Sequence, residues 1–125
     1  MDQIKFLAVD DSPTMRRIVV NTLKRIGYDD VIEAANGKDA LAKLYSEKVD
    51  MVITDWNMPE MNGLEFVKAV KSDENFKDLP ILMITTRGVK DDILEAMRAG
   101  VSSYIVKPFS PQTLKSKIET ILKQS

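Results

Sequence analysis

The chain has 125 residues, the length of one ordinary domain, and we expect a single domain over 1–125. Its 18 Lys and Arg residues nearly balance its 19 Asp and Glu residues, so the net charge of -1 excludes a general electrostatic attraction to nucleic acid or to an anionic membrane. The chain has no cysteine, which excludes disulfide and thiol chemistry, and no histidine, which removes the usual general base and phosphate-accepting nitrogen.

The sequence also lacks signals for membrane insertion or export. No apolar run approaches the roughly 20 residues needed to span a bilayer. Residues 1–6 lack the basic segment of a signal peptide, and we therefore expect a cytoplasmic protein.

An apolar run followed by helix start signals marks the first strand and the first helix. Residues 3–9 are mostly apolar and predict a strand. Ser12 suits a helix N-cap and Pro13 suits the first helical position. Apolar residues then recur at helical spacing until Gly27 ends the helix, which completes one strand-then-helix unit.

The same unit recurs four more times without a linker or a low-complexity segment. In chain order, these units are a strand at 31–34 and a helix from Asn36-Gly37, a strand at 49–55 and a helix from Asn62, a strand at 79–85 and a helix near 91–99, and a strand at 103–107 and a helix from Ser110-Pro111. Asn62 and Glu65 have the spacing of a capping box, and Gly100 ends the fourth helix. The alternation predicts a parallel sheet with helices on both faces.

The composition of the strands predicts their order in the sheet. The first, third and fourth strands are nearly uninterrupted apolar runs, which suit the middle of a sheet, whereas the second and fifth contain polar residues and suit its edges. The order 2-1-3-4-5 meets this condition and is the order found in flavodoxin. We therefore predict a doubly wound, flavodoxin-like α/β fold whose ligand crevice lies between the carboxyl ends of strands one and three.

Polar residues lie at the carboxyl ends of four of these strands. Asp10 and Asp11 follow the first strand, Asp55 ends the third, Thr85 ends the fourth and Lys107 ends the fifth. Because the carboxyl ends of parallel strands share one edge, we expect the three carboxylates to meet in one crevice. Like charges about 4 Å apart repel by roughly 4 kcal/mol at an effective dielectric of about 20, so the site requires positive charge.

Lys107 can supply one positive charge, and a divalent cation can supply two more. Carboxylate, carbonyl and water oxygens are hard ligands that suit Mg²⁺, which makes Asp10, Asp11 and Asp55 candidate metal ligands. A phosphoryl group fits between a metal, a lysine and a hydroxyl, with Asp55 as the nucleophile and an aspartyl phosphate as the product. Each residue taken alone is also consistent with a solvated turn, a strand end, strand packing or a surface lysine, so the interpretation depends on the combination.

Four stretches of the sequence resemble a known family over the whole length of the chain. They are VDDSPTMRRIV, DWNMPEMNGLEF, LPILMITT and SYIVKPF. They resemble the response-regulator receiver domain, and within it the single-domain regulators of chemotaxis. The resemblance implies a two-component signalling protein that is not an enzyme and that receives a phosphoryl group on Asp55 from a CheA-like histidine kinase. The absence of histidine agrees with this, because the phosphohistidine donor must then be another protein.

The resemblance also implies a metal site and a set of ligands for it. Asp11, Asp55 and the backbone carbonyl of Asn57 would contact Mg²⁺, and Asp10 would act mainly through a bound water. Asn57 and Arg87 lie close to the phosphate in such folds, and we hypothesise that both residues tune dephosphorylation.

A conformational switch is implied as well. Thr85 would move toward the phosphate and hydrogen-bond one phosphoryl oxygen, and Lys107, joined to Pro108 by a cis peptide bond, would pair with another. Tyr104 would turn inward and reshape the face made by the fourth helix, the fifth strand and the fifth helix. The structural alternative for Tyr104 is a half-buried aromatic residue on an edge strand.

Basic residues lie on or near this predicted face, namely Lys90, Arg98, Lys115 and Lys117. They could steer an acidic or amphipathic partner segment, although a solvated helix surface is the commoner meaning of such charges. The resemblance implies the flagellar motor switch protein or another target as the partner at this face. It also allows a separate phosphatase, and we expect a monomer.

The sequence departs from the best-known family pattern at Ser12-Pro13, Thr86 and Arg87. Three alternative functions remain open at this point. One is a phosphorelay intermediate. Another is a Mg²⁺-dependent phosphatase with an aspartate nucleophile, although the sequence Asp55-Trp56-Asn57 lacks the second acid that such enzymes usually carry. The third is a flavin-binding module, although the loop after the first strand has no glycine-rich phosphate cradle.

Overall fold

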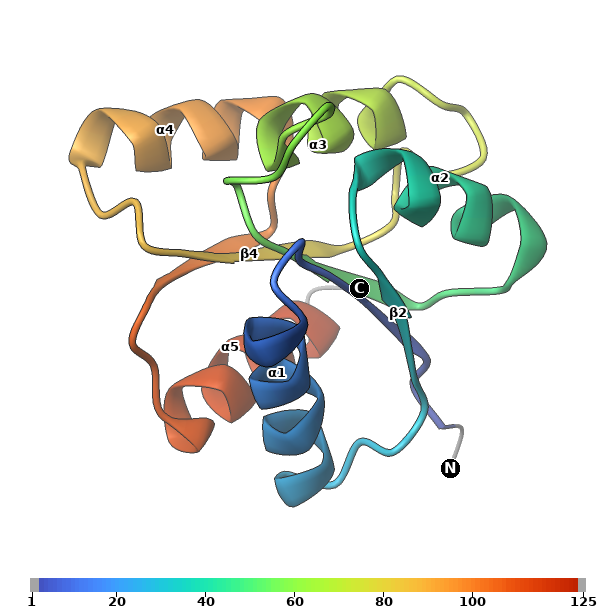
Figure 1. Ribbon diagram of the computed structural model, residues 1–125. Helices are drawn as coiled ribbons and strands as arrows, with labels where there is room; N and C mark the ends of the chain where they lie inside the picture. Colours follow the sequence, from blue (N-terminus) through green and yellow to red (C-terminus); the bar gives the residue numbers. More distant parts are fainter. Residues whose placement is uncertain (1–2, 124–125) are drawn as a thin grey trace.

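The structure is a computed structural model that describes residues 3–123 (Figure 1). Within these residues five strands alternate with five helices, as predicted. The strands are β1 (Phe6–Val9), β2 (Val31–Ala34), β3 (Met51–Thr54), β4 (Ile81–Thr85) and β5 (Ser103–Val106), and the helices are α1 (Pro13–Arg25), α2 (Gly37–Ser46), α3 (Gly63–Lys71), α4 (Lys90–Ala99) and α5 (Pro111–Lys123). Residues 1, 2, 124 and 125, which the expected domain of 1–125 includes, lie outside the described residues.

The strands form one parallel sheet in the predicted order β2-β1-β3-β4-β5. The three central strands, β1, β3 and β4, are buried along their whole length. The two edge strands, β2 and β5, are only partly buried, as expected from their polar residues. These observations confirm the predicted doubly wound, flavodoxin-like α/β fold.

The helices cover both faces of the sheet (Figure 1). Helices α2, α3 and α4 lie on one face, and α1 and α5 lie on the other. Successive residues of a strand point to opposite faces, so Val52 of β3 packs in the same cluster as Phe66 of α3, and Ile53 packs in the same cluster as Leu114 of α5. Burying each such side chain contributes about 1.5–3 kcal/mol, and the two layers together hold the strand ends in place.

The predicted helix ends are also observed. The Ser12 hydroxyl accepts a hydrogen bond from the Met15 N–H (3.2 Å) and caps α1. Asn62 and Glu65 form a reciprocal capping box at the start of α3, with distances of 2.8 and 2.9 Å. Gly100 has a φ of 116° and ends α4, because this left-handed conformation favours glycine.

Four strands are shorter than predicted, namely those expected at 3–9, 49–55, 79–85 and 103–107. At the start of β1, the Lys5 N–H donates to the Asp50 carboxylate (2.9 Å). Before β4, the Leu79 N–H donates to the Phe76 carbonyl (3.0 Å) in a turn, and Pro80 has no N–H to donate. At the starts of these two strands, a side chain and a turn thus take the bonds that a longer strand would have used. Among the described helices, none combines the length and the apolar composition that crossing a bilayer requires.

The first residue of α3 lies against the end of β3. The Gly63 N–H donates to the Trp56 carbonyl (2.7 Å), and a Cβ at Gly63 would lie 2.0 Å from the backbone oxygen of Asp55. Such a contact is impossible without moving the backbone on which Asp55 sits. Only glycine allows this close approach of α3 to the strand end.

Gly37 offers a matched control for this contact. It is likewise the first residue of a helix and follows an asparagine N-cap. The atoms nearest to a Cβ at Gly37 would belong to the side chain of Met61, at 2.8 Å, and that flexible side chain can move aside.

We predict that Gly63→Ala lowers the free energy of unfolding by about 2–4 kcal/mol, because the added methyl overlaps backbone atoms. This loss is expected although alanine is the better helix former. Gly37→Ala should change the free energy of unfolding by less than about 1 kcal/mol. Urea unfolding followed by circular dichroism measures both values, and equal effects of the two substitutions would contradict this interpretation of the contact.

Candidate functional site

Asp10 and Asp55 are held at neighbouring strand ends by the sheet itself. Val9 pairs with Thr54 in the register of β1 and β3. The Asp55 N–H donates to the Val9 carbonyl (3.1 Å), and the Asp10 N–H donates to the Ala34 carbonyl (3.2 Å). The hydrogen-bonded ladder therefore continues one residue past β1 and β3 and fixes the backbone of both aspartates.

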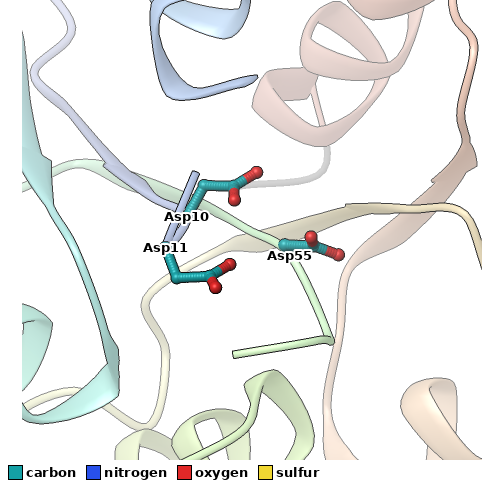
Figure 2. A group of neighbouring side chains, drawn as sticks. All are labelled: Asp10, Asp11 and Asp55. Carbon is teal, nitrogen blue, oxygen red and sulfur yellow. The ribbon is translucent and has the colours of Figure 1, made fainter. Parts of the chain in front are cut away.

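Three carboxylates meet at this edge of the sheet. One carboxylate oxygen from each of Asp10, Asp11 and Asp55 can be chosen so that all three lie within 4.8 Å of one another. Figure 2 shows their side chains leaving neighbouring segments of the chain after β1 and β3. Asp10 is buried, Asp55 is half-buried and Asp11 is exposed, so the group extends from the interior to the surface. The convergence expected from the parallel strand order is thus observed.

Backbone hydrogen bonds orient two of these carboxylates. Oδ1 of Asp10 accepts from the Ser12 N–H (3.0 Å), and Oδ1 of Asp55 accepts from the Trp56 N–H (2.6 Å). Their Oδ2 atoms face Lys107, whose Nζ lies 3.3 Å from Asp10 and 3.4 Å from Asp55. Each carboxylate is therefore held at one oxygen by the backbone and at the other by the same ammonium group.

Lys107 supplies one positive charge to three carboxylates. Its side chain is only 8% exposed, and the peptide bond to Pro108 is cis, as the resemblance implied. Burial raises the pKa of Asp10 above its usual range, while the Ser12 N–H and Lys107 act in the opposite direction. The site thus retains excess negative charge, and it would be stabilised by a further cation.

The donor set fits a hard divalent cation. Three carboxylates within 4.8 Å of one another provide oxygen ligands of the kind that Mg²⁺ prefers. The site opens into a cavity of about 620 Å³, lined by Asp10, Asp11, Ser12, Met15, Ile18, Asp55, Asn57, Thr86, Lys107, Pro108 and Phe109. The cavity has room for a ligand beside the carboxylates and Lys107.

Thr85 lies at the carboxyl end of β4 and does not line the cavity. Its side chain is fully buried at the end of β4, and the neighbouring Thr86 lines the cavity instead. The Thr85 hydroxyl oxygen accepts a hydrogen bond from the Arg87 N–H (3.3 Å). Because that bond uses a lone pair, the hydroxyl proton is still able to donate.

Tyr104 is half-buried on β5 and packs against the apolar cluster of α2, α3 and α4. Its hydroxyl donates to the Arg87 carbonyl (2.8 Å). Burial, together with the charge of Asp92, raises the pKa of Tyr104 to about 12. The ring is therefore tied to the loop between β4 and α4 in this structure.

Arg87, which the resemblance places near the phosphate together with Asn57, makes several side-chain contacts. Its guanidinium carbon lies 4.7 Å from the centre of the Trp56 ring, and its Nε–H donates to the Asn57 side-chain oxygen (3.0 Å). Its Nη1 pairs with Asp92 (3.4 Å). Arg87 thus joins the loop that follows Asp55 to the first turn of α4.

Arg16 is a residue near the site that sequence reasoning missed. Its Nη1 donates to the backbone oxygen of Asp10 (2.7 Å), and its Nε–H donates to Glu33 of β2 (2.9 Å). It therefore holds the turn after β1 against β2. The only signal for this role was its place one helical turn after the Ser12 N-cap, which lies beside the strand end.

The face made by α4, β5 and α5 exposes both basic and apolar side chains. Lys90, Arg98 and Lys115 are exposed, and Lys117 is partly exposed. Three large apolar side chains are exposed beside them on α4 and β5, namely Leu94, Met97 and Val106. This mixture suits contact with an amphipathic partner.

Comparison with known proteins identifies the family. The model of the response regulator receiver domain matches residues 6–119. Chemotaxis protein CheY1 of Helicobacter pylori is 58% identical to this chain over 120 residues, which are 95% of this chain and 97% of the relative. Chemotaxis protein CheY of Pseudomonas aeruginosa is 48% identical over 121 residues, with 97% and 98% of the two chains covered.

Solved structures agree with these sequence matches. The structure of the chemotaxis protein CheY4 of Vibrio cholerae aligns with a TM-score of 0.88 at 42% sequence identity, covering 96% of this chain and 99% of the other. CheY and flavodoxin share the strand order described above. The resemblance inferred from the sequence is therefore confirmed. The chain belongs to the response regulator receiver domain family, whose members are phosphoacceptors in two-component signalling, and within it resembles the CheY chemotaxis proteins.

Proposed function

We propose that this chain is a signalling switch controlled by phosphorylation of Asp55. The observation that carries the proposal is the meeting of Asp10, Asp11 and Asp55 beside the buried Lys107, at the mouth of a cavity. Asp55 is the candidate nucleophile because it is half-buried, oriented by the Trp56 N–H and open to the cavity.

The proposed reaction transfers a phosphoryl group from a histidine of another protein. A carboxylate oxygen of Asp55 attacks the phosphorus, the new O–P bond forms as the P–N bond breaks, and the imidazole of the donor leaves with the electron pair. Lys107 then pairs with one phosphoryl oxygen, and the Thr85 hydroxyl donates to another. Attack by water on the aspartyl phosphate later restores the carboxylate and releases inorganic phosphate.

The proposed ligands of Mg²⁺ are Asp10, Asp11, Asp55 and the backbone carbonyl of Asn57. Of these, Asp10 would act mainly through a water molecule. When bound, this ion supplies positive charge that offsets the charge of the carboxylates and of the transferred phosphoryl group. The support for this assignment is the hard oxygen donor set and the excess negative charge of the site.

The phosphodonor is a CheA-like histidine kinase in this proposal. The chain has no histidine of its own, so the phosphohistidine has to come from a partner. The matched relatives are chemotaxis proteins, which supports a place for this chain in chemotaxis. We further propose that the chain acts in the cytoplasm as a monomeric single receiver domain over 1–125 and that a separate phosphatase can end the signal.

The proposed output surface is the face made by α4, β5 and α5. Phosphorylation would draw Thr85 toward the phosphate and change the position of Tyr104, which lies on β5 and so belongs to this face. The exposed basic and apolar side chains there would bind the flagellar motor switch protein or another target.

Removing one carboxylate should show two separate effects, namely the stability that the charge cluster costs and the contribution of the cluster to metal binding. We predict that Asp10→Asn raises the free energy of unfolding by about 1 kcal/mol at neutral pH in a chelator, because a raised pKa in the folded state means that the ionised form of Asp10 costs stability. That cost is present above the folded-state pKa and disappears as the pH falls below the unfolded value.

Saturating Mg²⁺ should reverse this ranking of the two proteins. The wild type should gain about 2.7 kcal/mol at a Mg²⁺ concentration 100 times its dissociation constant, and Asp10→Asn should gain clearly less at the same concentration. Asp29→Asn, which removes an exposed carboxylate elsewhere, should gain as much as the wild type. Equal gains in Asp10→Asn and wild type, measured by urea unfolding, would argue against the proposed metal site.

Trp56 should report phosphorylation directly. It is the only tryptophan of the chain and immediately follows Asp55, so its fluorescence should change on addition of Mg²⁺ and again on addition of acetyl phosphate. Asp55→Asn should abolish the second change. If Asp55→Asn still shows the fluorescence change on addition of acetyl phosphate, the proposal is wrong. Steady turnover of many phosphomonoesters by the wild type would favour an enzyme instead.

Asn57 and Arg87 are proposed to tune the lifetime of the phosphorylated state. Arg87→Glu should shorten that lifetime about two- to fivefold, because an anion would repel the phosphoryl group and free the Asn57 side chain to hold the attacking water. Lys90→Glu makes the same change in net charge a short distance along the chain and should leave the lifetime nearly unchanged. Identical lifetimes in wild type and Arg87→Glu, measured by loss of radiolabelled phosphate, would remove the idea.

A further inference from the structure

Arg87 connects two separate parts of the molecule through its side chain. On one side its guanidinium group stacks on Trp56 and bonds Asn57, the two residues that follow Asp55. On the other side it pairs with Asp92 in the first turn of α4. The same guanidinium group thus contacts the loop of the proposed phosphorylation site and the helix that borders the proposed output face.

The start of α4 lacks the side-chain cap found at the starts of the other described helices, so it depends more strongly on the contact with Arg87. Within residues 3–123, α1, α2 and α3 begin with a side-chain cap from Ser12, Asn36 and Asn62, and at α5 the Ser110 hydroxyl accepts from the Thr113 N–H. The N-cap residue of α4 is Val89, which provides no such bond and is 63% exposed. The ion pair between Arg87 and Asp92 is therefore a side-chain tie that holds this helix end to the site.

This tie is weak enough to be replaced by a stronger partner. The Arg87 and Asp92 side chains are 41% and 27% exposed, and their 3.4 Å separation is long for a charge-assisted hydrogen bond. A phosphoryl group on Asp55 would carry a charge of about -1.5 to -2 and three acceptor oxygens. Arginine binds such a group through two parallel hydrogen bonds, which the single contact to Asp92 cannot match.

We propose that Arg87 is a positioning residue that couples the charge on Asp55 to the first turn of α4. When Asp55 carries a phosphoryl group, the guanidinium group turns toward it and releases Asp92. The first turn of α4 then loses its tie to the site and opens more often. The movement also reaches Tyr104, because its hydroxyl is bonded to the Arg87 carbonyl. This inference rests on the proposed function of Asp55.

Two neighbouring carboxylates provide a matched test. Asp91 and Asp92 both lie in the first turn of α4 and both favour a helix start by their charge, but in the described structure only Asp92 pairs with Arg87. The amide of Ile93 bonds the Val89 carbonyl (3.1 Å) across this turn, so its hydrogen exchange reports opening of the helix start.

The experiment measures exchange of the Ile93 amide by NMR, with Mg²⁺ alone and with Mg²⁺ and beryllium fluoride as a phosphoryl mimic. In the wild type and in Asp91→Asn, beryllium fluoride should speed this exchange about two- to fivefold. In Asp92→Asn and Arg87→Gln the exchange should already be faster with Mg²⁺ alone, and beryllium fluoride should add little. Loss of the response in both aspartate variants would instead indicate a general effect of helix-end charge and would overturn the coupling.

The mimic also separates this inference from the proposed function. If beryllium fluoride changes Trp56 fluorescence in the wild type but not in Asp55→Asn, the phosphoacceptor site stands. If, under those conditions, beryllium fluoride speeds Ile93 exchange in Asp92→Asn as much as in the wild type, the proposed role of Arg87 is overturned and the proposed function of Asp55 is not affected. If no protein responds to the mimic at Trp56, the proposed function fails and this inference fails with it.

Discussion

Three carboxylates share one buried ammonium group at the carboxyl edge of the sheet, and the rest of the structure can be understood from this imbalance of charge. Lys107 lies 3.3 and 3.4 Å from Asp10 and Asp55, and Asp11 adds a third negative charge within 4.8 Å. Such an arrangement costs stability unless further positive charge arrives. A site that is poorly balanced by itself is well suited to bind a cation and then an anion together, which is the chemistry of a phosphoacceptor.

Parts of the fold outside the site hold the carboxylates in this arrangement. The apolar layers on both faces of the sheet fix the register of β1 and β3, so the two aspartates cannot separate to relieve their repulsion. Gly63 lets α3 begin directly against the backbone of Asp55, and Arg16 ties the turn after β1 to β2. Stability contributed by the core thus maintains an unfavourable charge cluster, a pattern expected where a protein site is built for function.

The sequence was sufficient to predict the strand order and the charge cluster, because both follow from short-range patterns. Apolar and mixed strands differ in composition, and parallel strands bring their carboxyl ends together. Side-chain contacts across elements could not be predicted in this way. The stacking of Arg87 on Trp56 and the exclusion of Thr85 from the cavity depend on rotamers that packing selects. Strand ends were overestimated because residues such as Leu79 bond within turns, which apolar patterns do not reveal.

The role of Asp55 as phosphoacceptor is tested most directly by locating the phosphoryl group itself. Borohydride reduction of an aspartyl phosphate leaves homoserine, which peptide mapping by mass spectrometry assigns to a position. After incubation with acetyl phosphate and Mg²⁺, we expect homoserine at position 55 alone, and little or none when a chelator replaces Mg²⁺. Homoserine at position 10 or 11, or equal labelling of position 55 in the chelator, would contradict it.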